Sequence, residues 1–375
     1  MELALPILSY PCDFRPDIDI IRRQMISISL DVEVLRASKG SCQEDFLEPF
    51  LGRLKRVLQM VSISLGASLA VQPADRLLAY DIGGSHVTAG LCLLEPLTVV
   101  QMAIAPLPDA ISSDAFIGLL QELGQQLSGG VHGAAGASIA FPGPFVYNTG
   151  ISHMRHKLEA LYGVDLRTTL ADRFGWVPEQ VRFLNDADAA LLGEAGAGAA
   201  QGAAKAVGIM LGTGIGFAFV QNGELNDTAE MLPPDNEIWN LPFMEGIVED
   251  VLSSRGLERD YEARTAKHRS VAAIAQEVAT DPDAGAVFET FGCYLGQVIQ
   301  EILAPLAPEV IVFGGGISRS SHLFLPAARN HVNGLGIRLV PSVLLEKAPL
   351  LGAAMYWRDC AVRESASRSA LMDAK

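Results

Sequence analysis

The sequence predicts an α/β protein built from two related lobes, and three features of the chain support this fold class. Short apolar segments typical of strands alternate with longer segments typical of helices, which is the pattern of an α/β fold. A strand, a glycine turn and a return strand occur twice, first around Asp81 and again around Gly212. The 375 residues are 49% hydrophobic and 19% charged, which excludes a disordered or fibrous protein.

The elements follow one another in the order that such a fold requires. The first half opens with expected strands at 77–81, 87–94 and 97–105, and continues with strands at 134–141 and 181–184 and helices at 114–127 and 186–200. The second half opens with strands at 206–211 and 217–221, and continues with helices at 270–278 and 285–303 and a strand at 310–313. Residues 1–75 carry no glycine motif of this kind, and they are expected to be an N-terminal extension, partly helical or disordered. An amphipathic helix is predicted within 42–71.

Charge and cysteine content narrow the choice of partners and location. The net charge of −15 disfavours a protein that binds nucleic acid, because neutralising phosphates requires a basic face. The five cysteines are odd in number and form no Cys-x-x-Cys pair, which indicates free thiols in the cytoplasm. The uncharged stretch 57–74 is interrupted by Gln, Ser, Gly and Pro, so no membrane span is expected.

The first motif with chemical meaning is the segment Asp81-Ile-Gly83-Gly84-Ser85. Its glycines let the backbone turn tightly and present N–H groups to a phosphate, and Ser85 adds a hydroxyl. Asp81 can hold a hydrated Mg²⁺ ion, because this ion takes one or two carboxylates together with phosphate oxygens. The alternative interpretation is a hairpin whose aspartate serves only the turn.

The second motif, Gly212-Thr213-Gly214-Ile-Gly216, has the same physical logic, with Thr213 as the hydroxyl. It is not a P-loop, because no Gly-Lys-Ser/Thr follows, and a strand follows it where a dinucleotide-binding motif requires a helix. Two such hairpins can face each other across a cleft and hold a triphosphate from both sides. A plain glycine hairpin is again the alternative.

A third glycine segment, Gly314-Gly315-Gly316, ends the strand predicted at 310–313. Its bare backbone permits a flat ring to approach closely, whereas the alternative is a turn that merely ends the strand. The segment Phe141-Pro-Gly143-Pro144 predicts a rigid turn after the strand at 134–141.

The pair Asn185 and Asp186 follows a strand and precedes an alanine-rich helix, so either residue can cap that helix. The functional interpretation is that the positive end of the helix keeps Asp186 ionised, so that it accepts a hydroxyl proton during phosphoryl transfer. Glu237 and Glu249 can accept hydrogen bonds from sugar hydroxyls, and Trp239 can pack on an apolar sugar face. Ordinary surface acids and a core tryptophan are the alternative.

Five segments follow one another along the chain: DIGGS, FPGP, NDADAALLGE, LGTGIG and FGGGIS. This ordered set resembles that of the ROK family of bacterial sugar kinases, within the actin and hexokinase superfamily. The resemblance covers roughly residues 77–357. It implies two ribonuclease-H-like lobes of the actin and hexokinase type, with ATP and a sugar in the cleft between them. The first lobe would comprise 76–190 and a C-terminal helix near 351–362, and the second would comprise 191–350. The family also suggests a homodimer.

The resemblance further implies roles for single residues. Asp81 to Ser85 match the first phosphate motif, Gly212 to Gly216 the second, and Gly314 to Gly316 the adenosine motif. Asp186 matches the catalytic base. The positions implied for sugar binding are Asn185, Glu237, Asn240, Glu249 and Gly143.

Two departures from the family pattern are visible. The zinc-binding cysteine cluster is absent and Asn240 stands in place of a metal-binding histidine, so no structural zinc site is expected. The segment Ile151–Lys157 replaces an Asn-Leu segment that touches the sugar in many members, so the resemblance does not specify glucose.

We therefore expect a glucokinase-like enzyme that depends on ATP and Mg²⁺ and phosphorylates a small-molecule hexose at its 6-hydroxyl, with Asp186 as general base. Two alternatives are a catalytically inactive sugar-binding regulator of the same fold and a glucokinase that uses polyphosphate. The intact Asp186 speaks against the first alternative. The net charge speaks against the second, because a polyphosphate donor favours a basic track.

Overall fold

The structure is a computed structural model that describes residues 75–108, 110–127, 129, 133–155 and 158–373. The predicted extension at 1–75 and its amphipathic helix lie outside these residues, apart from Asp75. Within the described part of the chain, every helix is too short or too polar to cross a membrane. The stretch 57–74, which was considered as a span from the sequence, is not among the described residues.

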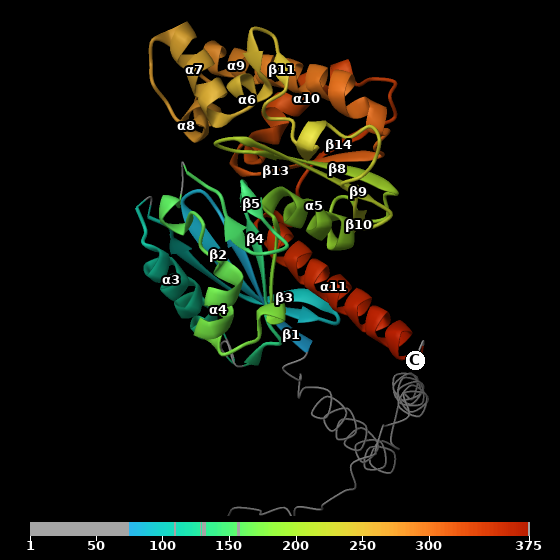
Figure 1. The fold of residues 1–375 in the computed structure, drawn as a ribbon. Coiled ribbons are helices and arrows are strands. Elements are labelled where there is room, and N and C mark those ends of the chain that lie inside the picture. The colour runs from blue at the N-terminus through green and yellow to red at the C-terminus, as the bar shows by residue number, and fades with distance from the viewer. Residues whose placement is uncertain (1–74, 109, 128, 130–132, 156–157, 374–375) are drawn as a thin grey trace, which may run out of the picture. The chain divides into compact units, whose positions relative to one another are not determined.

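The first half of the described chain forms a five-stranded sheet in the order β3-β2-β1-β4-β7 (Figure 1). Its strands are β1 Arg76–Ile82, β2 His86–Leu94, β3 Leu97–Pro106, β4 Ala137–Phe141 and β7 Val181–Asn185. The first three strands form an antiparallel meander, and β4 and β7 run parallel to β1. The strands predicted for this half are therefore confirmed, except that β4 begins three residues later than expected.

The second half repeats this arrangement with a sheet in the order β10-β9-β8-β13-β14. Its strands are β8 Lys205–Leu211, β9 Ile215–Gln221, β10 Glu224–Leu225, β13 Val310–Gly314 and β14 Arg338–Pro341. The antiparallel and parallel pairings match those of the first sheet position by position. The duplicated hairpin in the sequence thus corresponds to a duplicated sheet topology, and the predicted α/β fold class is confirmed.

Two helices lie between the sheets, α5 Asp186–Ala197 and α11 Ala348–Asp373 (Figure 1). Leu350 and Ala353 of α11 pack on Leu77 and Ala79 of β1. Other residues of the two helices pack on the second sheet, among them Leu191, Leu192 and Met355 against Ala206 and Val310. Both helices therefore belong to the cores of both halves.

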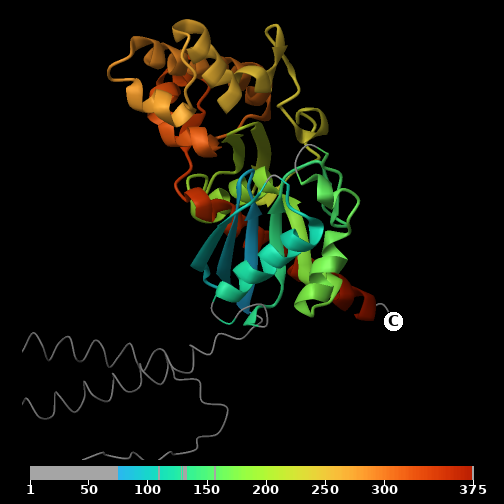
Figure 2. The same cartoon turned by 90° about the vertical axis from the view of Figure 1, so that its left-hand side faces the viewer.

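The remaining helices cover the outer faces of the sheets (Figures 1 and 2). Helices α3 Ser113–Gln126 and α4 Leu166–Phe174 pack on the first sheet through a core that includes Tyr80, Phe116 and Leu170. A larger helical layer covers the second sheet, and its members are α6 Val248–Val251, α7 Ser254–Thr265, α8 Val271–Glu277, α9 Pro282–Val298 and α10 Ser321–His331. The helix predicted at 285–303 is α9 followed by a π-helical turn at Ile299–Leu303.

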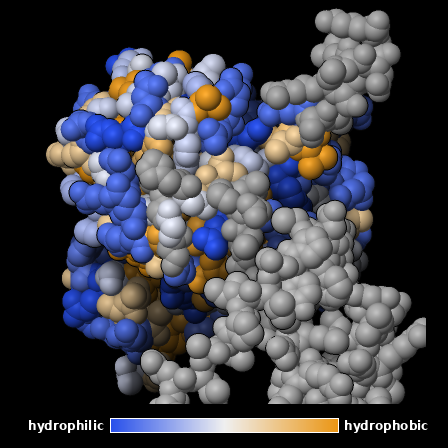
Figure 3. Space-filling view, turned by 90° about the horizontal axis from the view of Figure 1, so that it is seen from below, coloured by the Kyte–Doolittle hydropathy of each residue, from blue (hydrophilic) through white to orange (hydrophobic). Residues whose placement is uncertain are grey.

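Short two-stranded hairpins complete the described elements. They are β5 Phe145–Val146 with β6 Ile151–Ser152, and β11 Pro242–Phe243 with β12 Gly246–Ile247. On the face shown in Figure 3, hydrophilic residues predominate where the surface is not grey, and hydrophobic residues form small groups among them.

Candidate functional site

Asn185 joins the last strand of the first sheet to α5, and it caps that helix. Its Oδ1 accepts hydrogen bonds from the backbone N–H groups of Ala187 at 2.9 Å and Asp188 at 3.3 Å. Its amide Nδ2 donates to the hydroxyl of Tyr147 at 3.0 Å. The helix-capping interpretation is therefore confirmed for Asn185, and the side chain is held in one orientation by both ends of its amide.

Asp186 is the first residue of α5, and it is half-buried. Its Oδ1 accepts a hydrogen bond from the N–H of Ala187 at 2.9 Å, which lowers the pKa of the carboxyl group. Burial raises the same pKa by more, so that the pKa of Asp186 lies above its ordinary value. The expectation that the helix terminus keeps Asp186 ionised considered the backbone hydrogen bonds, which lower the pKa, and not burial, which raises the pKa by more.

Further carboxyl groups surround Asp186. Asp81 of β1 pairs in register with Ala140 of β4, and Ala140 pairs with Leu184 of β7. Because these three strands are parallel, Asp81 and Asp186 both lie at the carboxyl ends of the strands. Burial and the negative charge of Asp186 raise the pKa of Asp81 to about 7. Burial and the charges of Asp186 and Asp227 raise the pKa of Asp188 to about 7. Such a group of acids favours a bound cation, because a cation offsets their mutual repulsion.

The first glycine turn connects β1 to β2 beside these acids. The N–H of Gly83 donates to the carbonyl of His86 at 2.9 Å, which closes the turn. Gly84 and Ser85 are exposed at its tip, and Ser85 Oγ lies 3.3 Å from Nδ1 of His86. The tip of the turn is therefore open to solvent, and its role in binding a phosphate stays a prediction.

The second glycine turn connects β8 to β9, and it is closed by a hydrogen bond of 3.0 Å from the N–H of Gly212 to the carbonyl of Gly214. Thr213 is exposed at the tip. A Cβ on Gly216 would lie 3.1 Å from the Cβ of Ala187, which directly follows Asp186. The second turn therefore leads into a strand that packs against the first turn of α5.

The third glycine segment lies against the end of β8. Gly315 has a φ of +79°, and a Cβ on it would lie 2.3 Å from the carbonyl oxygen of Leu211. A Cβ on Gly314 would lie 2.3 Å from Sδ of Met210. Since Leu211 immediately precedes the second glycine turn, the structure brings the second and third glycine segments together.

The predicted sugar ligands of the second half lie in two segments that contact each other, because the N–H of Glu249 donates to the carbonyl of Trp239 at 3.0 Å, next to Asn240. Glu237 and Asn240 are exposed, and a Glu237 carboxylate oxygen accepts a hydrogen bond from the indole N–H of Trp239. Trp239 is itself 39% exposed, so the interpretation as a core tryptophan was wrong. Glu237 lies near enough to Tyr147 for its charge to contribute to raising the pKa of the phenol, although burial of the phenol is the larger cause.

Glu249 lies on the second glycine turn. Its Oε2 accepts a hydrogen bond from the N–H of Ile215 at 3.2 Å, and its Oε1 accepts one from Nη2 of Arg255 at 2.8 Å. This contact could not be predicted from the sequence, because it depends on how two separate segments pack.

Tyr147 is a residue that the sequence reasoning missed. Its hydroxyl donates to the carbonyl of Phe141 at 3.1 Å and accepts from Asn185, and burial is the main cause of its raised pKa. Gly143, in the turn before it, is exposed, and a Cβ there would lie 3.8 Å from the same hydroxyl. Tyr147 thus links the Phe141–Pro144 turn to Asn185. Its place three residues after that turn was the only available hint.

The donor set suits a magnesium ion better than a transition metal. No cluster of three or more His, Cys, Asp or Glu side chains placed to hold a metal occurs in the described parts of the chain. Asp81, at the edge that carries the first glycine turn, offers the hard carboxylate oxygens that Mg²⁺ takes together with phosphate oxygens and water. The residues present therefore fit a magnesium ion that arrives with a phosphate ligand.

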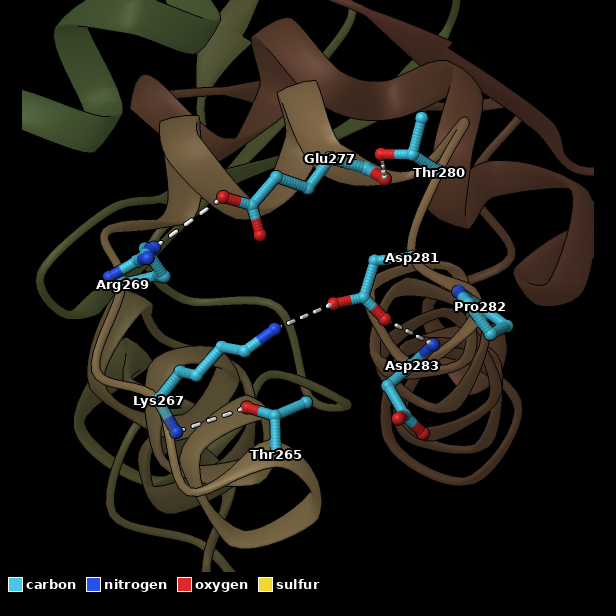
Figure 4. Close-up of a pocket in the computed structure, with 8 residues that line it drawn as sticks. All are labelled: Thr265, Lys267, Arg269, Glu277, Thr280, Asp281, Pro282 and Asp283. Atoms are coloured by element: carbon cyan, nitrogen blue, oxygen red, sulfur yellow. Dashed lines mark hydrogen bonds and ion pairs between the residues drawn. The ribbon is translucent and has the colours of Figure 1, made fainter.

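A separate polar depression of about 600 Å³ lies among α7, α8 and α9 (Figure 4). Two ion pairs cross it, from Lys267 to Asp281 at 3.9 Å and from Arg269 to Glu277 at 3.4 Å. None of the predicted site residues lines it, so it is not the candidate site.

Curated relatives of the chain are sugar kinases by name. A glucokinase from Thermotoga maritima is 26% identical over 315 residues, which cover 75% of this chain and 97% of that protein. A polyphosphate glucokinase from Mycobacterium tuberculosis is 25% identical over 281 residues, covering 73% of this chain and 88% of that protein.

Solved structures share the fold. A ROK hexokinase from Thermus thermophilus matches with a TM-score of 0.62 and 23% identity, covering 74% of this chain and 96% of that one. A ROK family glucokinase from Streptomyces griseus, in complex with glucose and AMPPNP, matches with a TM-score of 0.59 and 22% identity, covering 76% and 99%. The model of the ROK family matches residues 77–360, which is most of the chain. With its duplicated sheets and three glycine segments, the chain belongs to the ROK family.

Proposed function

We propose that this chain is a sugar kinase that transfers the terminal phosphoryl group of ATP to the 6-hydroxyl of a hexose. The observation that carries the proposal is the convergence of Asp186, the first glycine turn and the second glycine turn at one edge of the two sheets. The names of the curated relatives support sugar phosphorylation, and the Streptomyces griseus neighbour holds glucose and AMPPNP.

In this proposal Asp186 removes the proton of the attacking hydroxyl. Burial raises its pKa above the ordinary value, and a carboxylate accepts a proton more readily when its pKa is raised. Asn185, held by Tyr147, would orient the sugar with Glu237, Asn240, Glu249 and Gly143. Positioning and electrostatics would supply most of the rate enhancement, since phosphoryl transfer needs little covalent help.

The glycine segments would bind the nucleotide. The turns Gly83 to Ser85 and Gly212 to Gly216 would hold the phosphates through the Ser85 and Thr213 hydroxyls and through backbone N–H groups that do not close the turns themselves, and Gly314 to Gly316 would contact the adenosine. Asp81 would hold a hydrated Mg²⁺ ion, which would supply positive charge against the phosphates. Exclusion of water from the site would prevent hydrolysis of the donor.

A second candidate is a kinase that takes the phosphoryl group from polyphosphate. The similarity to a polyphosphate glucokinase favours it, although this chain carries a net charge of −15. The two candidates share the acceptor chemistry and differ only in the donor.

The test is a product assay on the full chain with a panel of hexoses and amino sugars, with ATP or polyphosphate as donor, and with or without Mg²⁺. We expect formation of ADP and a sugar 6-phosphate only when Mg²⁺ is present, with glucose or a close relative as acceptor. Sugar binding without turnover for every donor would instead identify a regulator. A homodimer and a cytoplasmic location stay predictions, which light scattering and cell fractionation test.

A further inference from the structure

The segment that leads into α7 makes hydrogen bonds to both ends of the second glycine turn. Ser254 donates to the carbonyl of Gly212 twice, from its backbone N–H at 2.8 Å and from its hydroxyl at 3.0 Å. At the other end of the turn, the N–H of Ile215 donates to Oε2 of Glu249 at 3.2 Å. One short segment, 249–254, therefore holds both ends of the turn.

Glu249 covers one side of that turn closely. A Cβ on Gly214 would lie 2.5 Å from Oε2 of Glu249, so only glycine leaves room for the carboxylate at this distance. The side chain of Glu249 is 21% exposed. A phosphate oxygen that binds the Ile215 N–H would occupy the place that this carboxylate oxygen now takes, because one N–H group directs a strong hydrogen bond to one acceptor.

Arg255 pairs with the other oxygen of the same carboxylate. Its Nη2 lies 2.8 Å from Oε1 of Glu249, and its side chain is 71% exposed. The guanidinium group fits carboxylate and phosphate equally well, because both present two oxygens to its planar fork. Arg255 thus places a positive charge beside the second glycine turn, and this charge attracts a phosphate chain.

We propose that Glu249 and Arg255 form a clasp on the second glycine turn that a chain of phosphates opens. A phosphate oxygen replaces Glu249 at the Ile215 N–H, and Arg255 exchanges the carboxylate for phosphate. The inference rests on the proposed function, since it concerns the donor side of the same site. The ligand chemistry is a linear phosphate chain, whether it belongs to a nucleotide or to inorganic polyphosphate.

The clasp predicts opposite effects for its two members. Glu249 competes with the phosphate chain for the Ile215 N–H, so its removal strengthens phosphate binding. Arg255 attracts the phosphate chain, so its removal weakens binding. A sugar that engages Glu249 would relieve the competition, so the sugar should strengthen nucleotide binding in the wild type and not in Glu249→Ala.

The experiment is calorimetric titration of the full chain with AMPPNP and Mg²⁺, without sugar, and a parallel titration with tripolyphosphate. We expect Glu249→Ala to bind AMPPNP at least ~5-fold more tightly than the wild type, and Arg255→Ala at least ~5-fold more weakly, as loss of a charge-assisted contact predicts. Arg264→Ala is the matched control on the same helix, because Arg264 pairs with Asp260. Its affinity should stay within about twofold of the wild type, as exposed pairs contribute little. Tripolyphosphate binding with the same pattern, without AMPPNP binding, would identify polyphosphate as the source.

Glu249→Gln serves if Glu249→Ala does not fold, because it keeps the shape and removes the charge, and its expected effect has the same direction. The clasp is overturned if the wild type phosphorylates a sugar while Glu249 variants bind no more tightly or Arg255→Ala binds no more weakly. If no folded variant binds either probe, the proposed function fails together with the clasp.

Discussion

The buried carboxylate of Glu194 accepts a hydrogen bond from the hydroxyl of Ser342, and this contact joins α5 to the segment between β14 and α11. The same carboxylate accepts from the backbone N–H groups of Ala199, Val343 and Leu344. Glu194 is 1% exposed, so these donors take the place of water around a buried charge. Glu194 therefore fixes the end of α5 opposite to Asp186.

Replacement of Glu194 by Ala should destabilise the fold strongly. Three backbone N–H groups and a hydroxyl would lose their buried acceptor, and we expect a loss of about 3 kcal/mol in the free energy of unfolding. Urea unfolding followed by circular dichroism measures this. Glu122→Ala, at an exposed position of α3, is the control and should change stability by less than about 0.5 kcal/mol. Equal effects of the two substitutions would contradict the assigned contacts.

Asp186→Asn should lower kcat by at least ~10², the scale of general-base catalysis, while the protein stays folded. The amide keeps the size of the side chain and removes a charge that burial disfavours, so thermal stability should not fall. Steady-state kinetics with the preferred sugar and a thermal melt measure the two effects. The exposed Asp172→Asn on α4 is the control for a simple change of charge. Turnover at the wild-type rate in Asp186→Asn would remove the base assignment.

Gly315 and Gly316 look alike in the sequence, yet their substitution by Ala should have different results. At Gly315, a φ of +79° and the nearby Leu211 carbonyl leave no room for Cβ, so Gly315→Ala should cost at least ~2 kcal/mol of stability. At Gly316 no atom lies within 4 Å of the added Cβ, so Gly316→Ala should stay within about 0.5 kcal/mol. Chemical denaturation of the pair checks this. Any stability loss in Gly316→Ala as large as that in Gly315→Ala would disprove the difference.

Stability without ligands should depend on pH through Asp188. Its pKa is about 7 in the folded chain and 3.8 in its ordinary state, so the folded state binds more protons between these pH values. The stabilisation is complete below pH 3.8 and is lost as the pH rises through 7, by a few kcal/mol in order of magnitude. Asp188→Asn should therefore gain stability relative to the wild type at pH 8 and not at pH 4. Thermal melts of both proteins across this range test the sign, and a constant difference between them would refute it.

Much of the fold could be predicted from the sequence because its signals are local. Glycine turns between apolar runs identified both hairpins, and the order of motifs identified the family. Helix α7 was missed because it buries only Gly256, Leu257 and Tyr261, which is too little for an apolar periodicity. Helix α10 was missed because it contains Pro326, which is typical of a helix end.

The candidate site was predictable only in part, for a related reason. Asp81, Asp186 and the glycine turns carry their meaning in short segments. Other contacts arise between segments that are far apart in the chain. They are the hydrogen bond from Ile215 to Glu249, the effect of the Asp227 charge on Asp188 and the hydrogen bond from Asn185 to Tyr147. No periodicity or spacing encodes such contacts.

The packing of α11 on β1 has a consequence for synthesis on the ribosome. Leu77 and Ala79 are covered by Leu350 and Ala353, which are made more than two hundred residues later. Until those late residues emerge from the exit tunnel, one face of the first sheet stays uncovered and prone to aggregation. A nascent chain that stops before α11 should therefore depend on chaperones.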